Sequence, residues 1–154
     1  MVDEQQGGCL CGDVRYAVNG APKVCLACHC TFCQRFTSSA YSSVAYFDQN
    51  QVHLRTAVSE YVHRSDETGR TMTMQFCPRC GVTVAVVAEA RPGWVGVQIG
   101  TLDEKSGIRI QRHVWTRSKQ RGTVIPEDVD EYDKGSADGA APTRKASRRG
   151  SPSE

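Results

Sequence analysis

The sequence lacks the features that mark several large classes of protein. None of its hydrophobic runs approaches the roughly 18 apolar residues of a transmembrane helix. Neither sign of charge is in clear excess, because 19 Lys and Arg oppose 17 Asp and Glu, a net charge of +2. That balance gives no argument for a nucleic acid or a membrane surface as a partner. Residues 1–6 are acidic and polar, unlike a signal peptide, so we expect a cytoplasmic protein.

An amphipathic helical pattern is also lacking, and the best candidate for a helix is one short turn after Cys33, at residues 34–36. Segments rich in β-branched residues with alternating polarity are frequent instead. The sequence therefore predicts a mainly β fold with antiparallel sheets. Strands are expected at residues 14–18, 43–47, 51–55, 60–63, 71–76, 82–87, 94–99 and 108–115.

The composition changes near the C-terminus. The 154 residues, 39% of them hydrophobic, suffice for one domain with a buried core. Beyond residue 135, Gly, Ser, Ala and Pro dominate, which favours disorder. We predict a folded domain at residues 1–134 and a disordered tail at residues 135–154. Four of the tail's residues are basic and two acidic, so the rest of the chain is formally neutral. The basic stretch at residues 144–149 is more typical of a solvated terminus than of a nucleic-acid contact.

The cysteines are the unusual feature of the composition, with eight in the chain. Because cytosolic thiols are kept reduced, a disulfide framework is not expected. Two short motifs, Cys9-Leu10-Cys11-Gly12 and Cys77-Pro78-Arg79-Cys80-Gly81, look like two halves of one zinc site. In each, the glycine lets the backbone turn after the second cysteine. The sequence predicts a structural zinc on these four cysteines, against the alternative that they are ordinary buried thiols.

The second group of cysteines is Cys28, Cys30 and Cys33. Three thiolates hold one zinc and leave its fourth position open, which is the pattern of a catalytic zinc. Cys25 is close enough in sequence to close the site as a fourth ligand, and His29 is another candidate ligand. An iron–sulfur cluster also fits four thiolates at these spacings. Spacing alone leaves these alternatives open.

Three motifs together resemble the glutathione-dependent formaldehyde-activating enzyme family, also described as the centromere-protein-V-like domain. They occupy residues 8–16, 28–35 and 76–81, and residues 100–103 and 113–115 look like later, weaker motifs of that family. The resemblance spans about residues 7–133. It implies antiparallel β structure pinned by a structural zinc, with a second, catalytic zinc in a Cys-rich loop. The implied ligands are Cys9, Cys11, Cys77 and Cys80 for the first of these two zincs per chain, and Cys28, Cys30 and Cys33 for the second.

The family's activity joins formaldehyde to glutathione to give S-hydroxymethylglutathione, classed as a carbon–sulfur lyase for the reverse reaction. The resemblance therefore implies a small thiol and a small aldehyde as partners. Cys25 matches none of the family's ligands, which favours an open second site.

Two departures from the family's sequence pattern affect the substrate pocket. Ser38-Ser39 stands where relatives usually have Gly-Ser, so Ser38 is a poor substitute if that glycine has a positive φ. Residues 120–123 replace an aromatic residue that often follows the His-x-Trp motif.

The ligand set constrains the chemistry. Zinc with three thiolates carries a net charge of −1, so it is a weak Lewis acid that still favours the thiolate form of a bound thiol. The hypothesis is that a substrate thiolate attacks an aldehyde carbon. We include Arg35 with Cys28, Cys30 and Cys33 among the catalytic residues, to bind a substrate carboxylate or steady the oxyanion. The alternative for Arg35 is a surface salt bridge.

The sequence also bears on the roles of two histidines and on two alternative functions. We expect His29 to point away from the metal, in a supporting or surface role, and His113 to pack near Trp115 instead of acting as a base.

A zinc deaminase is a weak alternative function. Such an enzyme has a Glu two residues after its first ligand, and here that position is Cys30. The remaining alternative is a non-enzymatic, zinc-stabilised module that binds protein or nucleic acid, which a closed second site would favour.

Overall fold

The computed structural model describes residues 4–137 and 139–147. Within this range the chain forms two compact units. The first contains residues 4–25 and 44–109, and the second contains residues 26–43 and 110–147, without residue 138. The described part of the chain contains no helix that is both long and apolar enough to cross a membrane. A cytoplasmic location stays a prediction.

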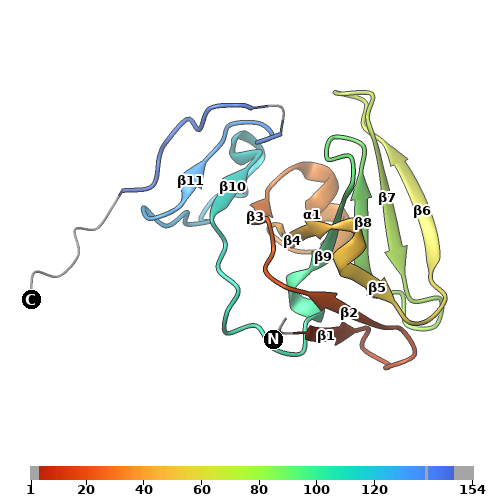
Figure 1. Cartoon of the computed structure of the whole chain (residues 1–154). Helices are drawn as coiled ribbons and strands as arrows, with labels where there is room; N and C mark the ends of the chain where they lie inside the picture. The colour runs from red at the N-terminus through yellow and green to blue at the C-terminus, as the bar shows by residue number, and fades with distance from the viewer. Residues whose placement is uncertain (1–3, 138, 148–154) are drawn as a thin grey trace, which may run out of the picture. The chain divides into compact units, whose positions relative to one another are not determined.

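The first unit is built from antiparallel strands (Figure 1). A three-stranded sheet has the order β1 (Glu4–Gly8), β2 (Arg15–Asn19) and β5 (Val52–Leu54). A run of five strands has the order β4 (Ser42–Asp48), β9 (Trp94–Gln98), β8 (Thr83–Ala88), β7 (Thr71–Phe76) and β6 (Ser59–Arg64). Two short 3₁₀ helices, Gln49–Gln51 and Ile99–Thr101, follow β4 and β9.

The core of the first unit combines apolar side chains with cysteines. Strand β2 contributes Tyr16 and Val18, which are buried on one face of the strand because side chains alternate along it. Two cysteines of the predicted structural site also belong to this core. The full cluster is Cys9, Val14, Tyr16, Val18, Cys25, Ala45, Phe47, Cys77, Val84, Ala85, Val97 and Leu102.

The second unit contains a small parallel sheet and one helix. Strand β10 (Arg112–Val114) lies between residues 26–28 of β3 (Val24–Cys28), the part of that strand that belongs to this unit, and β11 (Asp130–Glu131), and it runs parallel to both. Helix α1 (Thr31–Thr37) follows β3 directly, and a 3₁₀ helix, Thr116–Ser118, follows β10. The predicted mainly β fold is therefore confirmed, but the prediction of antiparallel sheets is wrong for the parallel pairing of β10 in this unit.

Several predicted boundaries need correction. The expected strand at residues 108–115 is reduced to β10, because Ile108 closes a turn onto the carbonyl of Lys105. Helix α1 begins at Thr31, before Cys33 and not after it. Strands β1, β3 and β11 were not predicted. The second cysteine group accordingly lies on the end of a strand and the start of a helix instead of in a loop.

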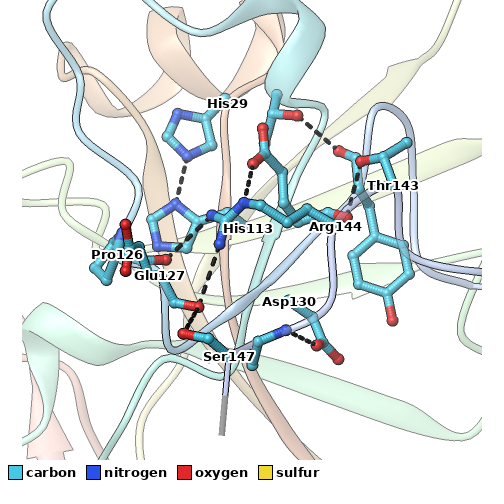
Figure 2. Close-up of polar contacts among 12 residues, drawn as sticks. His29, His113, Pro126, Glu127, Asp130, Thr143, Arg144 and Ser147 are labelled. Atoms are coloured by element: carbon cyan, nitrogen blue, oxygen red, sulfur yellow. Dashed lines mark hydrogen bonds and ion pairs between the residues drawn. The ribbon is translucent and has the colours of Figure 1, made fainter. Parts of the chain in front are cut away.

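Part of the predicted tail contacts β11. The backbone N–H of Thr143 donates to the carbonyl of Glu131 at 2.8 Å, and the Glu131 N–H donates to the carbonyl of Arg144 at 2.8 Å. The Arg144 guanidinium also binds the Glu131 carboxylate at 3.0 Å (Figure 2). The boundary at residue 134 stays a prediction. Four of the charged residues on which the tail's charge depends lie outside the described residues: Asp138, Arg148, Arg149 and Glu154.

Candidate metal centres

The first unit brings together the sulfurs of Cys9, Cys11, Cys77 and Cys80, all within 4.8 Å of one another. The Sγ atoms of Cys9 and Cys11 are 3.5 Å apart, and those of Cys11 and Cys77 are 3.7 Å apart. Four sulfurs at about 2.3 Å from a tetrahedral zinc lie about 3.8 Å from each other. The donor set and its spacing therefore fit a tetrahedral zinc.

Two glycine turns aim these sulfurs at one centre. Gly12 and Gly81 have φ values of 84° and 75°, a conformation that a side chain would strain. The N–H of Gly12 donates to the carbonyl of Cys9, and that of Gly81 donates to the carbonyl of Cys77. The prediction that a glycine turns the backbone after each cysteine pair is thus confirmed.

Backbone N–H groups donate hydrogen bonds to three of the four sulfurs, those of Cys9, Cys77 and Cys80. The backbone N–H of Val14 donates to Cys9 Sγ at 3.2 Å, and that of Arg79 donates to Cys77 Sγ at 3.4 Å. Backbone N–H groups, that of Val82 first, lower the pKa of Cys80 to about 6. Hydrogen bonds to a charged sulfur favour its charged form, which is the form that binds a metal.

A salt bridge joins the two motifs outside the sulfurs. Arg79 Nη1 lies 3.0 Å and 3.2 Å from the two carboxylate oxygens of Asp13. Both side chains are largely exposed, so the pair adds little stability by itself. Because Asp13 follows Cys11 closely and Arg79 precedes Cys80, the pair links the two turns that carry the ligands.

The second unit brings together the sulfurs of Cys28, Cys30 and Cys33, again within 4.8 Å of one another. Cys28 is the last residue of β3, Cys30 is the N-cap of α1, and Cys33 lies in the first turn of that helix. Cys28 and Cys33 are only 9% and 4% exposed. Three buried or half-buried sulfurs on a strand and a helix form a donor set that fits a tetrahedral zinc with its fourth coordination position left for another ligand.

Cys30 has a structural role in addition to its place in this group. Its sulfur accepts the backbone N–H of Cys33 at 3.3 Å, as the side chain of an N-cap residue does. Hydrogen bonds from the Cys28 and Cys33 thiols, and then from backbone N–H groups, lower the pKa of Cys30. This direction favours the thiolate form of Cys30, which is the form that binds a metal.

Cys25 does not belong to the three-sulfur group. Its side chain is part of the apolar core of the first unit and is 2% exposed. Burial raises the pKa of its thiol to about 11, so it remains a neutral thiol at physiological pH. These observations fit a core residue better than a fourth ligand.

His29 lies between two of the three cysteines in sequence, but its imidazole contacts His113. The Nε2 atom of His29 is 2.8 Å from Nδ1 of His113 (Figure 2). His29 is fully buried and His113 is 5% exposed, so the possible surface role of His29 is wrong and its supporting position fits. Burial lowers the pKa of both imidazoles, and that of His29 falls to about 4 with a further contribution from His113.

Arg35 and Ser38 occupy the last turn and the end of α1. Arg35 is exposed and lies two positions after Cys33, so the two side chains leave the helix in different directions. Ser38 is the C-cap residue, with φ 51° in the left-handed region. The sequence-based concern about Ser38 is therefore confirmed, because this position has the conformation that favours glycine.

Two residues near the second group were not predicted from the sequence. Tyr41 packs against both histidines, with ring centroids 5.0 Å from His29 and 6.0 Å from His113. Gln34 donates its side-chain amide to the carbonyls of His29 and Ser118 at 2.8 Å and 2.9 Å. The one feature of the sequence that could have indicated a role for Gln34 is its position directly after Cys33 in the cysteine motif.

Comparisons with known proteins agree with this geometry. The sequence profile of a family described as "Glutathione-dependent formaldehyde-activating enzyme" matches residues 4–118. Among solved structures, the fold is similar to the crystal structure of a Rhodobacter sphaeroides protein, with a TM-score of 0.51 and 21% sequence identity. That alignment covers 68% of this chain and 90% of the other. No match was found among curated proteins.

The family match covers most of the chain and includes both cysteine groups. It also includes the two histidines that meet beside the second group. The chain belongs to the glutathione-dependent formaldehyde-activating enzyme family.

Proposed function

We propose that the protein catalyses the reversible addition of a small thiol, glutathione, to formaldehyde, as a zinc-dependent carbon–sulfur lyase. In the forward direction the thiol sulfur forms a bond to the aldehyde carbon, and the proton lost by the thiol ends on the aldehyde oxygen. In the reverse direction the same carbon–sulfur bond breaks. Family membership supports the substrates, and the three-sulfur group of Cys28, Cys30 and Cys33 supports the chemistry.

The observation that carries the proposal is that this group has three sulfurs and not four. Zinc bound there would lower the pKa of the substrate thiol. Cys28, Cys30 and Cys33 would hold that zinc, and Cys9, Cys11, Cys77 and Cys80 would hold a second, structural zinc. The alternative, a zinc-stabilised binding module, needs Cys25 to close the second site as a fourth ligand. The place of Cys25 in the apolar core disfavours a closed site.

Arg35 completes the proposal as a substrate-binding residue. Its guanidinium is exposed and leaves α1 in a different direction from Cys33, so it suits a carboxylate at the end of glutathione better than the reacting oxygen. Replacing Arg35 by Ala should raise KM for glutathione several-fold and leave KM unchanged for a short thiol without carboxylates. Lys119→Ala, at another exposed position of the second unit, is the matched control.

The test is the rate at which the zinc-loaded protein interconverts formaldehyde with glutathione and S-hydroxymethylglutathione, measured by exchange NMR. We expect the protein to accelerate exchange above the uncatalysed rate. Cys33→Ser should abolish the acceleration, and Cys25→Ser should retain it. Exchange at the uncatalysed rate in the presence of protein fully loaded with zinc would contradict the proposal.

A further inference from the structure

We infer that His113 is a positioning residue: its hydrogen bond to His29 sets the orientation of the segment that carries Cys28, Cys30 and Cys33. This inference rests on the proposed metal centre at these three cysteines. It concerns two residues that are not themselves ligands, because the group that could hold the metal contains only the three sulfurs.

The backbone of His29 is fixed on both sides of its Cα atom. Its N–H donates to the carbonyl of Val114 at 2.9 Å, which extends the parallel pairing of β3 and β10 by one step beyond Cys28. Its carbonyl accepts the side-chain amide of Gln34 at 2.8 Å. Since Cys28 and Cys30 flank His29, a rotation of the His29 backbone moves both sulfurs.

The imidazole of His29 is the third anchor, and a single hydrogen bond orients it. Nε2 lies 2.8 Å from His113 Nδ1, whereas Nδ1 is buried and has no hydrogen-bond partner among the described residues. A buried nitrogen without a hydrogen-bond partner is destabilising, so the ring depends on its one polar contact. The bond to His113 is therefore the polar contact that distinguishes this ring orientation from a flipped one.

The position of His113 is itself well determined. It lies on β10 opposite Ala27 of β3 and Glu131 of β11, so pairing on both sides fixes its backbone. Its ring is 5% exposed and packs beside Tyr41. A rigid strand thus presents Nδ1 to the residue between two ligands, much as an outer-shell partner orients a metal ligand.

The test uses cadmium-loaded protein, because NMR of bound cadmium gives one resonance for each centre. In His113→Phe, which keeps a ring beside Tyr41 but removes Nδ1, we expect the resonance of the three-sulfur centre to shift. We expect cadmium at that centre to bind about tenfold more weakly, the lower end of the effect of losing an outer-shell partner. The resonance of the four-sulfur centre should not move.

Two further variants separate positioning from loss of stability. His113→Asn places an amide near the position of Nδ1 and should restore most of the resonance position and affinity. Thr116→Val removes another buried hydrogen bond of the second unit, from Oγ1 to the carbonyl of Tyr132 at 3.1 Å, and should leave the three-sulfur resonance unchanged.

The inference is overturned if His113→Phe binds two cadmium ions with the affinity and spectrum of the parent protein, or if Thr116→Val produces the same changes as His113→Phe. Failure of the proposed metal centre gives a different result, because the parent protein itself would then show no resonance for the three-sulfur group.

Discussion

The sulfurs of Cys11 and Cys77 lie 3.7 Å apart although 66 positions separate them in the sequence. This contact closes the chain between β1 and the turn after β7 into one long loop. Cys9 and Cys77 are also buried in the core of the first unit. A metal that joins these sulfurs therefore constrains a large part of that unit, because closing a long loop removes much of the entropy of the unfolded chain.

Loss of a four-sulfur ligand should destabilise the protein strongly. We expect Cys80→Ser to lower the free energy of unfolding by at least about 3 kcal/mol, because structural zinc sites contribute directly to folding. Denaturant unfolding of zinc-loaded protein measures this. Cys25→Ser changes another cysteine of the first unit outside the sulfur group and should cost less. Equal losses in the two variants would contradict a structural metal at the first group.

Ser38 should be improved by glycine. Its φ of 51° strains a residue with a side chain, and glycine adopts this conformation without that penalty. We expect Ser38→Gly to raise the free energy of unfolding by about 0.5–1 kcal/mol, the left-handed penalty less the greater entropy that glycine has in the unfolded chain, as measured by thermal unfolding. Ser39 is outside the left-handed region, so Ser39→Gly should be neutral or destabilising. A destabilised Ser38→Gly would show that the side chain contributes more than the strain costs.

Stability should fall in alkaline solution because of Tyr16. Its hydroxyl lies 2.8 Å from Thr101 Oγ1, which itself donates to the carbonyl of Gln98, so the tyrosine is the donor. Burial raises the pKa of Tyr16 to about 12. The folded state thus holds this proton more tightly than the unfolded state. This stabilisation is complete below the ordinary tyrosine pKa of about 10. As the pH rises towards about 12 the stabilisation is lost, and the free energy of unfolding falls by up to about 3 kcal/mol.

Unfolding free energies measured across this pH range test the effect. Tyr16→Phe should remove most of the alkaline slope, whereas Tyr61→Phe, at an exposed position of β6, should retain it. An unchanged slope in Tyr16→Phe would assign the alkaline loss to other groups.

Arg144 should hold the segment at residues 139–147 against β11. Its guanidinium binds the Glu131 carboxylate. It also binds the carbonyls of Glu127 and Pro126, both labelled in Figure 2. The pair is partly exposed, so we expect Arg144→Ala to cost about 1 kcal/mol. Amide hydrogen exchange at Glu131 and Thr143 should become about fivefold faster, and Lys145→Ala should leave it unchanged. Exchange of these amides at unfolded-chain rates in the parent protein would support the predicted disorder instead.

The sequence predicted the local features well and the long-range ones poorly. Alternation located β7 at its observed bounds, and the cysteine–glycine spacing located both halves of the first sulfur group. Strand β3 was missed because all five of its residues are buried, so it does not alternate. The parallel pairing of β10 and the contact of His29 with His113, 84 positions apart, depend on topology that spacing does not reveal.

The second sulfur group illustrates the same limit. Spacing alone left Cys25 and His29 open as fourth ligands. The choice depends on which way each side chain points, and that follows from β3 placing Cys25 in the core and from β10 presenting His113 to His29. The positive φ of Ser38 was foreseen only through comparison with the family's usual glycine.

The metal content of the purified protein and two cysteine variants tests the central claim most directly. Because the account assigns four sulfurs to one zinc and three to another, it predicts two zinc ions per chain in the parent protein and in Cys25→Ser, and one in Cys33→Ser. One zinc in the parent protein, iron in place of zinc, or loss of a zinc from Cys25→Ser would contradict it.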